Sequence, residues 1–287
     1  MDNLKAKKRH PEEIAVYTAI YVCAAFSVLL LLGIIIYVFA KGARRVNWAF
    51  LTGVTSILHG TVGIAGNILN TLIIILLTMI ITTPIGVGAA IYLNEYAKPG
   101  KLVTAIIFAT ETLAGIPSII YGFFGLMVIV PVIQDLTGTS GKGVLTASIM
   151  LGIMILPTII SVSESSLRAV PESYYEGSLA LGATHEKSVF FTMVPAAKSG
   201  IMAGIILGIG RAIGETMAVV MVAGNQAVIP ESITSGVRTM TINIVLEMGY
   251  AAKGMHRDAL IATAVVLFVF ILLINISFSL VKRRDNR

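Results

Sequence analysis

Glu176-Gly-Ser-Leu-Ala-Leu-Gly182 is a polar stretch in a chain that otherwise consists mostly of long apolar runs. Val170-Pro171-Glu172 precedes it and favours the start of a helix. Proline suits the first helical turn, and an acid suits the positive end of the helix dipole. Gly182 is placed to end this helix, because glycine readily adopts the left-handed conformation that follows many helix ends. We therefore predict a short helix outside the apolar runs that ends at Gly182.

A second short helix is expected to follow. Thr184 can cap its first turn. Pro195 is expected to end it, because proline lacks a backbone donor and clashes with the preceding helical turn. Two short helices with apolar faces need a protein surface to cover them, which is either the rest of this chain or a partner protein. The apolar side chains concerned are Leu179, Leu181, Phe190 and Phe191.

The composition indicates an integral membrane protein. Hydrophobic residues make up 56% of the 287 residues, and the mean hydropathy is +0.90. Six apolar runs are long enough to cross a hydrocarbon core, which takes roughly 20 helical residues. We therefore predict an all-α, polytopic fold. The first run is too long for the apolar part of a signal peptide and is interpreted as a retained helix. The predicted spans are 14–40, 66–93, 103–133, 143–162, 199–223 and 258–281.

The basic residues predict the orientation. Most of the 21 lysines and arginines fall in the tails 1–13 and 282–287 or in the loops on the same side, including 163–198. Basic loops are retained in the cytoplasm. We therefore predict cytoplasmic tails, a transmembrane domain over 14–281 in the cytoplasmic membrane, and a cytoplasmic segment over 163–198. A basic cluster at Lys41–Arg45 lies on the other side. Topology and lipid headgroups explain the net charge of +6, so nucleic acid is not an expected partner.

The sequence gives no sign of an enzyme. Cys23 is the single cysteine, and the four histidines lack metal-ligand spacing, so we predict no metal site. No Gly-x4-Gly-Lys-Ser/Thr phosphate loop occurs, so ATP hydrolysis by this chain is not expected. No pair of a nucleophile and a base stands out either. No cofactor is predicted.

The third run contains helix breakers, which leave two interpretations open. Breakers persist in a membrane only where other protein or a water-lined cavity satisfies the freed backbone groups. The run is either a kinked packing helix or a broken helix that lines a pathway. The breakers are Gly115, Pro117, Gly122, Gly125 and Pro131. Outside the spans, 47–67 is expected to be an external loop or re-entrant cap, and 239–248 an amphipathic stretch on the outer surface.

The fifth run has a glycine seam. Gly200, Gly204 and Gly208 are four residues apart, which permits close helix packing. Arg211 and Glu215 continue the same face, and an arginine at membrane depth costs roughly 2.5–3.5 kcal/mol on insertion scales. The two side chains either form a structural ion pair at i,i+4 or belong to a functional site, and we favour the functional site. A second small-residue spacing, at Gly210 and Gly214, lies on an adjacent face.

With these features in view, the polar stretch resembles the pattern of ABC importer permeases: Glu-Ala-Ala, three residues, Gly, nine residues, Ile-x-Leu-Pro. Glu176, Gly182 and Pro195 fall in register, while Gly177, Ser178, Thr192 and Val194 replace the other pattern residues. The chain is further similar to permeases of the bacterial phosphate importer, the PstA/PstC family. The stretches that carry this similarity are 84–96, 111–122, 169–178 and 210–217, and Leu113–Ser118 and Arg211–Thr216 are the most specific to phosphate.

The resemblance implies a type I ABC importer permease fold and defines the expected partners. These are a second permease subunit in a heterodimer, a dimeric cytoplasmic ATPase and an extracytoplasmic phosphate-binding protein. It implies a substrate pathway at Arg211, Glu215, Thr216, Glu111 and Ser118. It implies coupling to the ATPase through 163–198, with Tyr175, Glu176, Gly177, Ser178, Leu181, Gly182, Ala183 and Pro195. The choice between PstA and PstC stays open. The alternatives are a permease for another oxyanion, such as molybdate or sulfate, and an ATP-independent channel or carrier.

Overall fold

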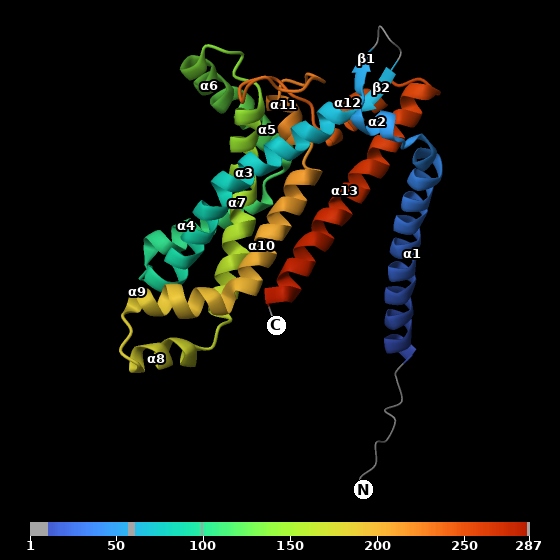
Figure 1. Ribbon diagram of the computed structural model, residues 1–287. Coiled ribbons are helices and arrows are strands. Elements are labelled where there is room, and N and C mark those ends of the chain that lie inside the picture. The colour runs from blue at the N-terminus through green and yellow to red at the C-terminus, as the bar shows by residue number, and fades with distance from the viewer. Residues whose placement is uncertain (1–10, 57–60, 99, 286–287) are drawn as a thin grey trace.

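A computed structural model describes residues 11–56, 61–98 and 100–285 as a helical bundle with one small β-hairpin (Figure 1). The hairpin pairs β1 (Val54–Ser56) with β2 (Thr61–Ile64) in antiparallel fashion. The helices are α1 (Pro11–Gly42), α2 (Trp48–Thr52), α3 (Ala65–Ile91), α4 (Lys101–Gly115), α5 (Ser118–Phe124), α6 (Val130–Thr137), α7 (Val144–Arg168), α8 (Glu172–Ala180), α9 (His185–Ser188), α10 (Val194–Gly214), α11 (Met217–Val222), α12 (Met240–Met248) and α13 (Met255–Asp285).

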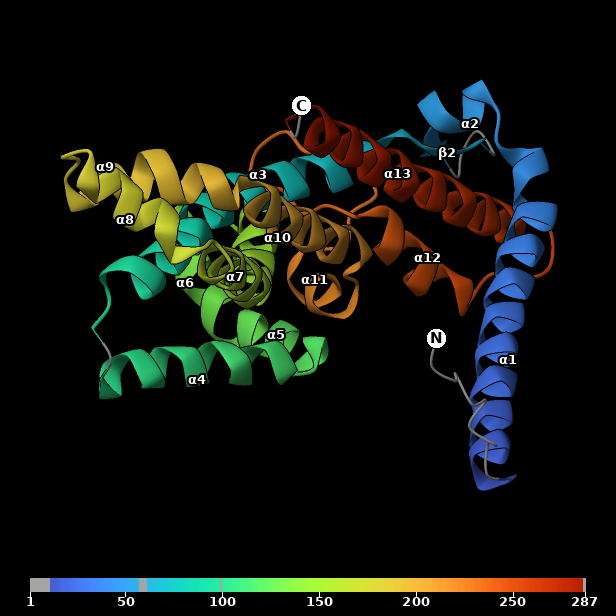
Figure 2. The same cartoon turned by 90° about the horizontal axis from the view of Figure 1, so that it is seen from below.

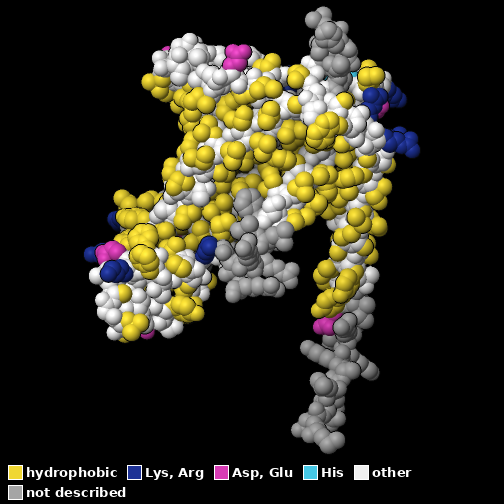
Figure 3. Space-filling view, in the orientation of Figure 1, with side chains coloured by type: hydrophobic (Ala, Val, Ile, Leu, Met, Phe, Trp, Pro, Cys, Tyr) yellow, Lys and Arg dark blue, Asp and Glu magenta, His cyan; other side chains and the backbone are white. Residues whose placement is uncertain are grey.

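Six helical segments in the described part of the chain are long and apolar enough to cross a membrane, which confirms the predicted number. Their bounds are Ala15–Arg45, Ala65–Tyr96, Ser118–Thr137, Val144–Arg168, His185–Gly214 and Met255–Ser277. Apolar side chains cover the middle of the molecule, whereas charged side chains gather toward its two ends (Figure 3). We call these the α8 end and the α12 end, after the helices found there.

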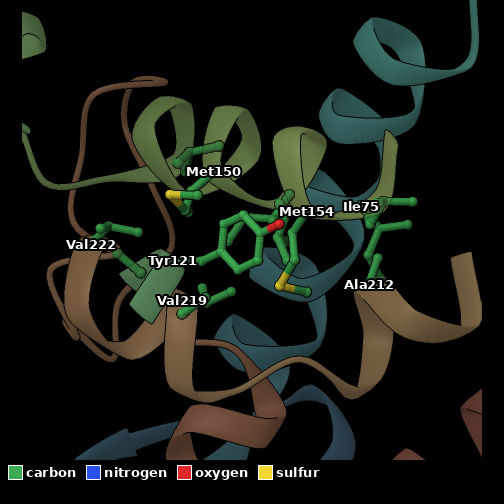
Figure 4. Close-up of a cluster of buried hydrophobic side chains, with 14 of the residues drawn as sticks. Ile75, Tyr121, Met150, Met154, Ala212, Val219 and Val222 are labelled. Atoms are coloured by element: carbon green, nitrogen blue, oxygen red, sulfur yellow. The ribbon is translucent and has the colours of Figure 1, made fainter. Parts of the chain in front are cut away.

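Helix α7 is the centre of the bundle, with α3 and α10 packed along it. Viewed from the α8 end, these helices group together, while α1 stands apart (Figure 2). α1 contacts α13 near the α12 end, where Phe39 and Phe268 meet edge to face at 5.5 Å. The ring of Tyr121 and side chains from α7 and α11, such as Met154 and Val219, fill the core between the helices (Figure 4).

The glycine seam of α10 packs against α7, as predicted. A Cβ added at Gly208 would lie 2.8 Å from Cγ2 of Ile155, and one at Gly204 would lie 3.1 Å from Cβ of Val162. At Gly200 it would overlap the side chain of Ser166. Lipid tails are as apolar as the helix surfaces, so close van der Waals contact, rather than removal of apolar surface from water, drives such packing. The three glycines therefore set the distance between α10 and α7.

The contact between α3 and α7 uses small and hydroxylated residues. Thr78 donates a hydrogen bond to the carbonyl of Ser148 (3.3 Å), and the Ser148 hydroxyl donates to the carbonyl of Ile74 (3.4 Å). A Cβ at Gly152 would lie 3.0 Å from the Thr82 hydroxyl oxygen. The reciprocal hydrogen bonds satisfy polar groups that have no water to bind in a bilayer core. They hold α3 in register on α7.

The third predicted span, 103–133, is not one helix. α4 ends at Gly115, Ile116 is extended with ψ of 131°, and α5 begins after Pro117. Pro117 cannot donate to the carbonyl of Leu113, which accepts hydrogen bonds from the Ile116 amide (3.2 Å) and the Tyr121 hydroxyl (2.6 Å). The structure therefore favours the broken helix of the two interpretations left open by the sequence.

Other predicted boundaries also need correction. The fifth span does not run to residue 223, because α10 ends at Gly214 and α11 is a separate short helix. The segment 47–67 is not a simple loop but contains α2 and the hairpin. α12 does not lie on the surface along its whole length, since its first residues are buried against the core. The predicted tails 1–13 and 282–287 lie partly outside the described residues.

The even number of spans predicts that both ends of the chain lie on one side of the membrane. Figure 1 shows the start of α1 and the end of α13 toward the side of the bundle that carries α8. A reporter that is active only in the cytoplasm, fused after Arg287, should be active. The same reporter fused after Thr139, at the α12 end, should be inactive. Activity of the exterior type after Arg287 would show that the orientation is wrong.

Candidate functional site

The polar stretch of the sequence forms a helical hairpin at the α8 end. Gly182 has φ of +84°, so it adopts the predicted left-handed conformation after α8. The amide of Gly182 donates to the carbonyl of Leu179 (2.9 Å), and that of Ala183 to the carbonyl of Ser178 (3.2 Å), which satisfies the last carbonyls of the helix. Thr184 then caps α9, accepting a hydrogen bond from the amide of Lys187.

Pro195 does not end the second helix, contrary to the prediction. A π-helical turn at Val189–Met193 joins α9 to α10, and the helix runs without a break from His185 to Gly214. Proline is tolerated here because it occupies the first turn of α10, where it follows the wider turn. The hairpin therefore continues directly into a membrane span.

Two departures from the permease pattern contact each other. The Thr192 hydroxyl donates to the Ser178 oxygen at 3.4 Å, and the Ser188 hydroxyl donates to the same oxygen at 3.0 Å. Ser178 and Thr192 stand where the pattern has alanine and isoleucine. The apolar contact implied by the pattern is replaced by hydrogen bonds that hold α8 on the following helix.

Apolar side chains of the hairpin remain uncovered. Leu181 is 92% exposed and Phe191 is 80% exposed, while Glu176 and Pro195 are also exposed. α8 has no buried residue. The second arm of the hairpin packs on the bundle through the buried Val189, whereas α8 does not bury its apolar side chains there. The exposed apolar side chains are therefore available to a protein partner.

Arg211 lies in the last turn of α10, on the face that packs against α7. Its Nη1 donates to the Thr158 hydroxyl of α7 at 3.4 Å, and its side chain is half-buried. Thr158 was not predicted as a site residue, because a threonine after a proline in an apolar run carries no distinctive signal. The side chain of Tyr121 also lies within electrostatic range of the guanidinium.

Glu215 does not pair with Arg211, so the structural ion pair that the sequence left open as the alternative is not formed. α10 ends at Gly214, so Glu215 has an extended backbone and leaves the helical face. Its carboxylate accepts a hydrogen bond from the amide of Ala218 at 3.1 Å and thereby caps the start of α11. Within residues 11–56, 61–98 and 100–285, Arg211 has no carboxylate partner.

The other predicted pathway residues do not join Arg211. Glu111 is exposed on α4, and Ser118 begins α5 after the break. Thr216 precedes α11 and donates to the carbonyl of Gly214 at 3.3 Å. In the described part of the chain no hydrogen bond links these side chains to the guanidinium. Of the candidate site, the structure shows the contact between Arg211 and Thr158.

Solved ABC importers share this fold. The structure of a bacterial alginate ABC transporter in complex with an alginate pentasaccharide-bound periplasmic protein matches with a TM-score of 0.67 and 14% identity, over 95% of both chains. An inward facing structure of the MetNI methionine ABC transporter matches with a TM-score of 0.57 and 22% identity, over 76% of this chain and 92% of the other. The fold is that of the permease subunit of a type I ABC importer.

Residues 82–286 match the family described as "Binding-protein-dependent transport system inner membrane component". Probable ABC transporter permease protein YqgH of Bacillus subtilis is 40% identical over 219 residues, 74% of this chain and 70% of its own length. Phosphate transport system permease protein PstC of Mesorhizobium japonicum is 34% identical over 289 residues, 91% and 87% of the two chains. The PstC of Haemophilus influenzae is 38% identical over 222 residues, 70% of each chain. This chain belongs to the binding-protein-dependent transport system inner membrane component family.

Membership of this family defines the general role of the chain. It is a multi-pass inner-membrane subunit of an ABC importer and works with a substrate-binding protein. It is a transport subunit and not an enzyme, because ATP hydrolysis belongs to a separate ATPase subunit.

The left-handed conformation of Gly182 generates a test of the hairpin. Gly182→Val should strain the turn by about 1–2 kcal/mol, because a side chain disfavours this conformation, and should raise the number of ATP molecules hydrolysed per substrate taken up. Gly138 is the matched control, since it is also left-handed (φ +67°) with open space around it, but lies after α6 at the α12 end. Purified complexes in proteoliposomes give both rates. Equal ratios for Gly182→Val and Gly138→Val would refute a coupling role for the turn.

Proposed function

We propose that this chain is one of two permease subunits of an ATP-driven importer of inorganic phosphate. The named phosphate permeases among its relatives, such as the PstC proteins of Mesorhizobium japonicum and Haemophilus influenzae, support this substrate. A phosphate-binding protein outside the membrane would deliver phosphate to the α12 end. A dimeric ATPase would engage the α8 end.

The observation that carries the proposal is the unpaired guanidinium of Arg211. A planar guanidinium can donate two parallel charge-assisted hydrogen bonds to a tetrahedral oxyanion. Its described protein partner is the neutral hydroxyl of Thr158, so its charge is not cancelled by a carboxylate in the described chain. An arginine in a span is costly to insert, and such residues almost always face the bundle interior or a water-filled cavity on a substrate pathway. Arg211 is therefore suited to attract phosphate into the bundle.

An open face beside Arg211 supports a second permease subunit as the partner. A Cβ at Gly210 or Gly214 would meet nothing within 4 Å, so this small-residue face is unpacked within the chain. α4 has no buried residue, although it carries large apolar side chains such as Phe108. Small residues and uncovered apolar helices suit helix packing in a membrane. A heterodimer would place the phosphate pathway between the two subunits.

The hairpin provides a route from the ATPase to this pathway. α8 and its exposed Leu181 would dock on the ATPase from the cytoplasm. The helix from His185 to Gly214 is continuous and carries Arg211 near its far end. Arg211 lies 17 residues beyond Val194, or about 25 Å along the axis at 1.5 Å per residue. Displacement of the hairpin would thus shift or tilt the helix that positions Arg211.

Arg211→Gln tests the proposed pathway. Glutamine fills similar space and keeps donors for Thr158 but lacks the charge. A hydrogen bond to a charged group contributes about 1.5–3 kcal/mol, so phosphate uptake per assembled complex should fall at least about tenfold. Arg211→Lys should restore only part of it, because the ammonium replaces the two-pronged donor with a point charge. Uptake of radiolabelled phosphate in proteoliposomes, normalised to assembled complex, measures the effect.

Glu215→Gln is the matched control on the same segment. Glutamine retains an oxygen that can accept the Ala218 amide, so uptake should stay within about twofold of wild type. Normal uptake per complex in Arg211→Gln would rule out the site. Excess sulfate or molybdate that abolishes phosphate uptake would instead favour another oxyanion as the substrate. Uptake without any ATPase would favour the channel or carrier alternative.

A further inference from the structure

His185 is the first residue of α9, the second helix of the hairpin. Its ring contacts Tyr175 of α8 and Tyr96, which follows helix α3. The Tyr175 hydroxyl of α8 shares a hydrogen bond of 2.8 Å with Nδ1 of His185, and their rings are 5.8 Å apart. On its other side, His185 meets the ring of Tyr96 edge to face, with centroids 4.8 Å apart. We call these three residues the His185 junction. It joins parts of the chain that are far apart in the sequence.

Tyr96 connects the junction to a second membrane span. It is the last residue of the π-helical turn Tyr92–Tyr96, which continues α3 toward the α8 end. The span Ala65–Tyr96 reaches the opposite end of the bundle and is locked to α7 by the hydrogen bonds of Thr78 and Ser148. Movement of Tyr96 would therefore be carried along α3 into the core.

The base of α8 leaves room for such movement. A cavity of about 330 Å³ lies between the start of α8 and the ends of α7 and α10, lined among others by Pro171, Tyr174 and Gly200. α8 has no buried residue, and its Tyr175 and Ser178 bind side chains of the helix that follows. α8 is thus attached to the following helix through Tyr175 and Ser178, while the cavity lies at its base.

We propose that the His185 junction transmits displacement of α8 to helix α3, in parallel with the direct path along His185–Gly214. His185 and Tyr96 are then positioning residues for coupling, and the rings act as a link between two spans that both pack on α7. With this link the two helices on α7 move together when α8 is displaced. Without it, α3 would follow α10 only through their direct packing, in which Ala90 and Ile91 share an apolar cluster with Ala197 and Ile201. This inference rests on the proposed docking of α8 on an ATPase.

The decisive variant is Tyr96→Leu, which removes the ring but keeps apolar bulk. Tyr92→Leu is the matched control, because Tyr92 begins the same π-helical turn, is 51% exposed and lies outside the junction. In proteoliposomes of the whole complex, Tyr96→Leu should raise the ATP hydrolysed per phosphate taken up at least threefold. Tyr92→Leu should leave the ratio of ATP hydrolysed to phosphate taken up unchanged. Tyr96→Phe, which keeps the ring, should have the wild-type ratio. Co-purification of the ATPase should be equal in all variants.

Tyr175→Phe tests the other half of the link, since it removes the hydrogen bond to His185 and keeps the ring. It should raise the ratio, and adding it to Tyr96→Leu should raise it no further, because the link is already broken. Equal ratios for Tyr96→Leu and Tyr92→Leu would overturn the inference. Loss of ATPase co-purification in Tyr96→Leu would also overturn it, because the junction would then be a docking element. A wild-type complex that takes up another oxyanion contradicts only the proposed substrate. The ATP hydrolysed per ion of that oxyanion taken up would still show whether the His185 junction transmits displacement to α3.

Discussion

The close approach of α10 to α7 is the constraint on which the rest of the structure depends. Gly200, Gly204 and Gly208 bring the two backbones together where any side chain would meet Ser166, Val162 or Ile155. Inside a bilayer, removal of apolar surface from water does not favour one helix pair over another. Close packing at small residues therefore decides which helices pair. Once α10 is seated on α7, Arg211 necessarily faces Thr158, and the adjacent small-residue face at Gly210 and Gly214 remains open for another subunit.

The prolines affect helix continuity differently, because the backbone around each proline differs. At Pro117 the helix breaks, and the Ile116 amide and the Tyr121 hydroxyl both donate to the carbonyl of Leu113, to which proline cannot donate. At Pro131 and Pro195 a π-helical turn comes just before, and the helix continues. The unbroken passage at Pro195 matters most for function, because it makes the hairpin and the Arg211 helix one body.

This arrangement would transmit a movement of the hairpin at the α8 end directly to Arg211, because both belong to the helix His185–Gly214. Packed helices are stiff, so a shift of the hairpin at His185 would appear at the other end of the helix His185–Gly214. The His185 junction would add α3 to the moving unit, which places the two helices that flank α7 under the control of one hairpin. Hydrogen bonds among Ser178, Ser188 and Thr192 keep that hairpin on its helix even though two of these residues depart from the permease pattern.

The sequence by itself determined the features that depend on local chemistry. Long apolar runs are sufficient to predict six spans, a glycine after a polar helix predicts the left-handed turn at Gly182, and spacing by four predicts the seam of α10. Only the tertiary structure decided where helices end and which polar groups meet. Glu215 leaves the helix and caps α11, so periodicity alone mispaired it with Arg211. The same limit applies to Thr158, Tyr96 and His185, whose partners lie on other helices and depend on how those helices pack.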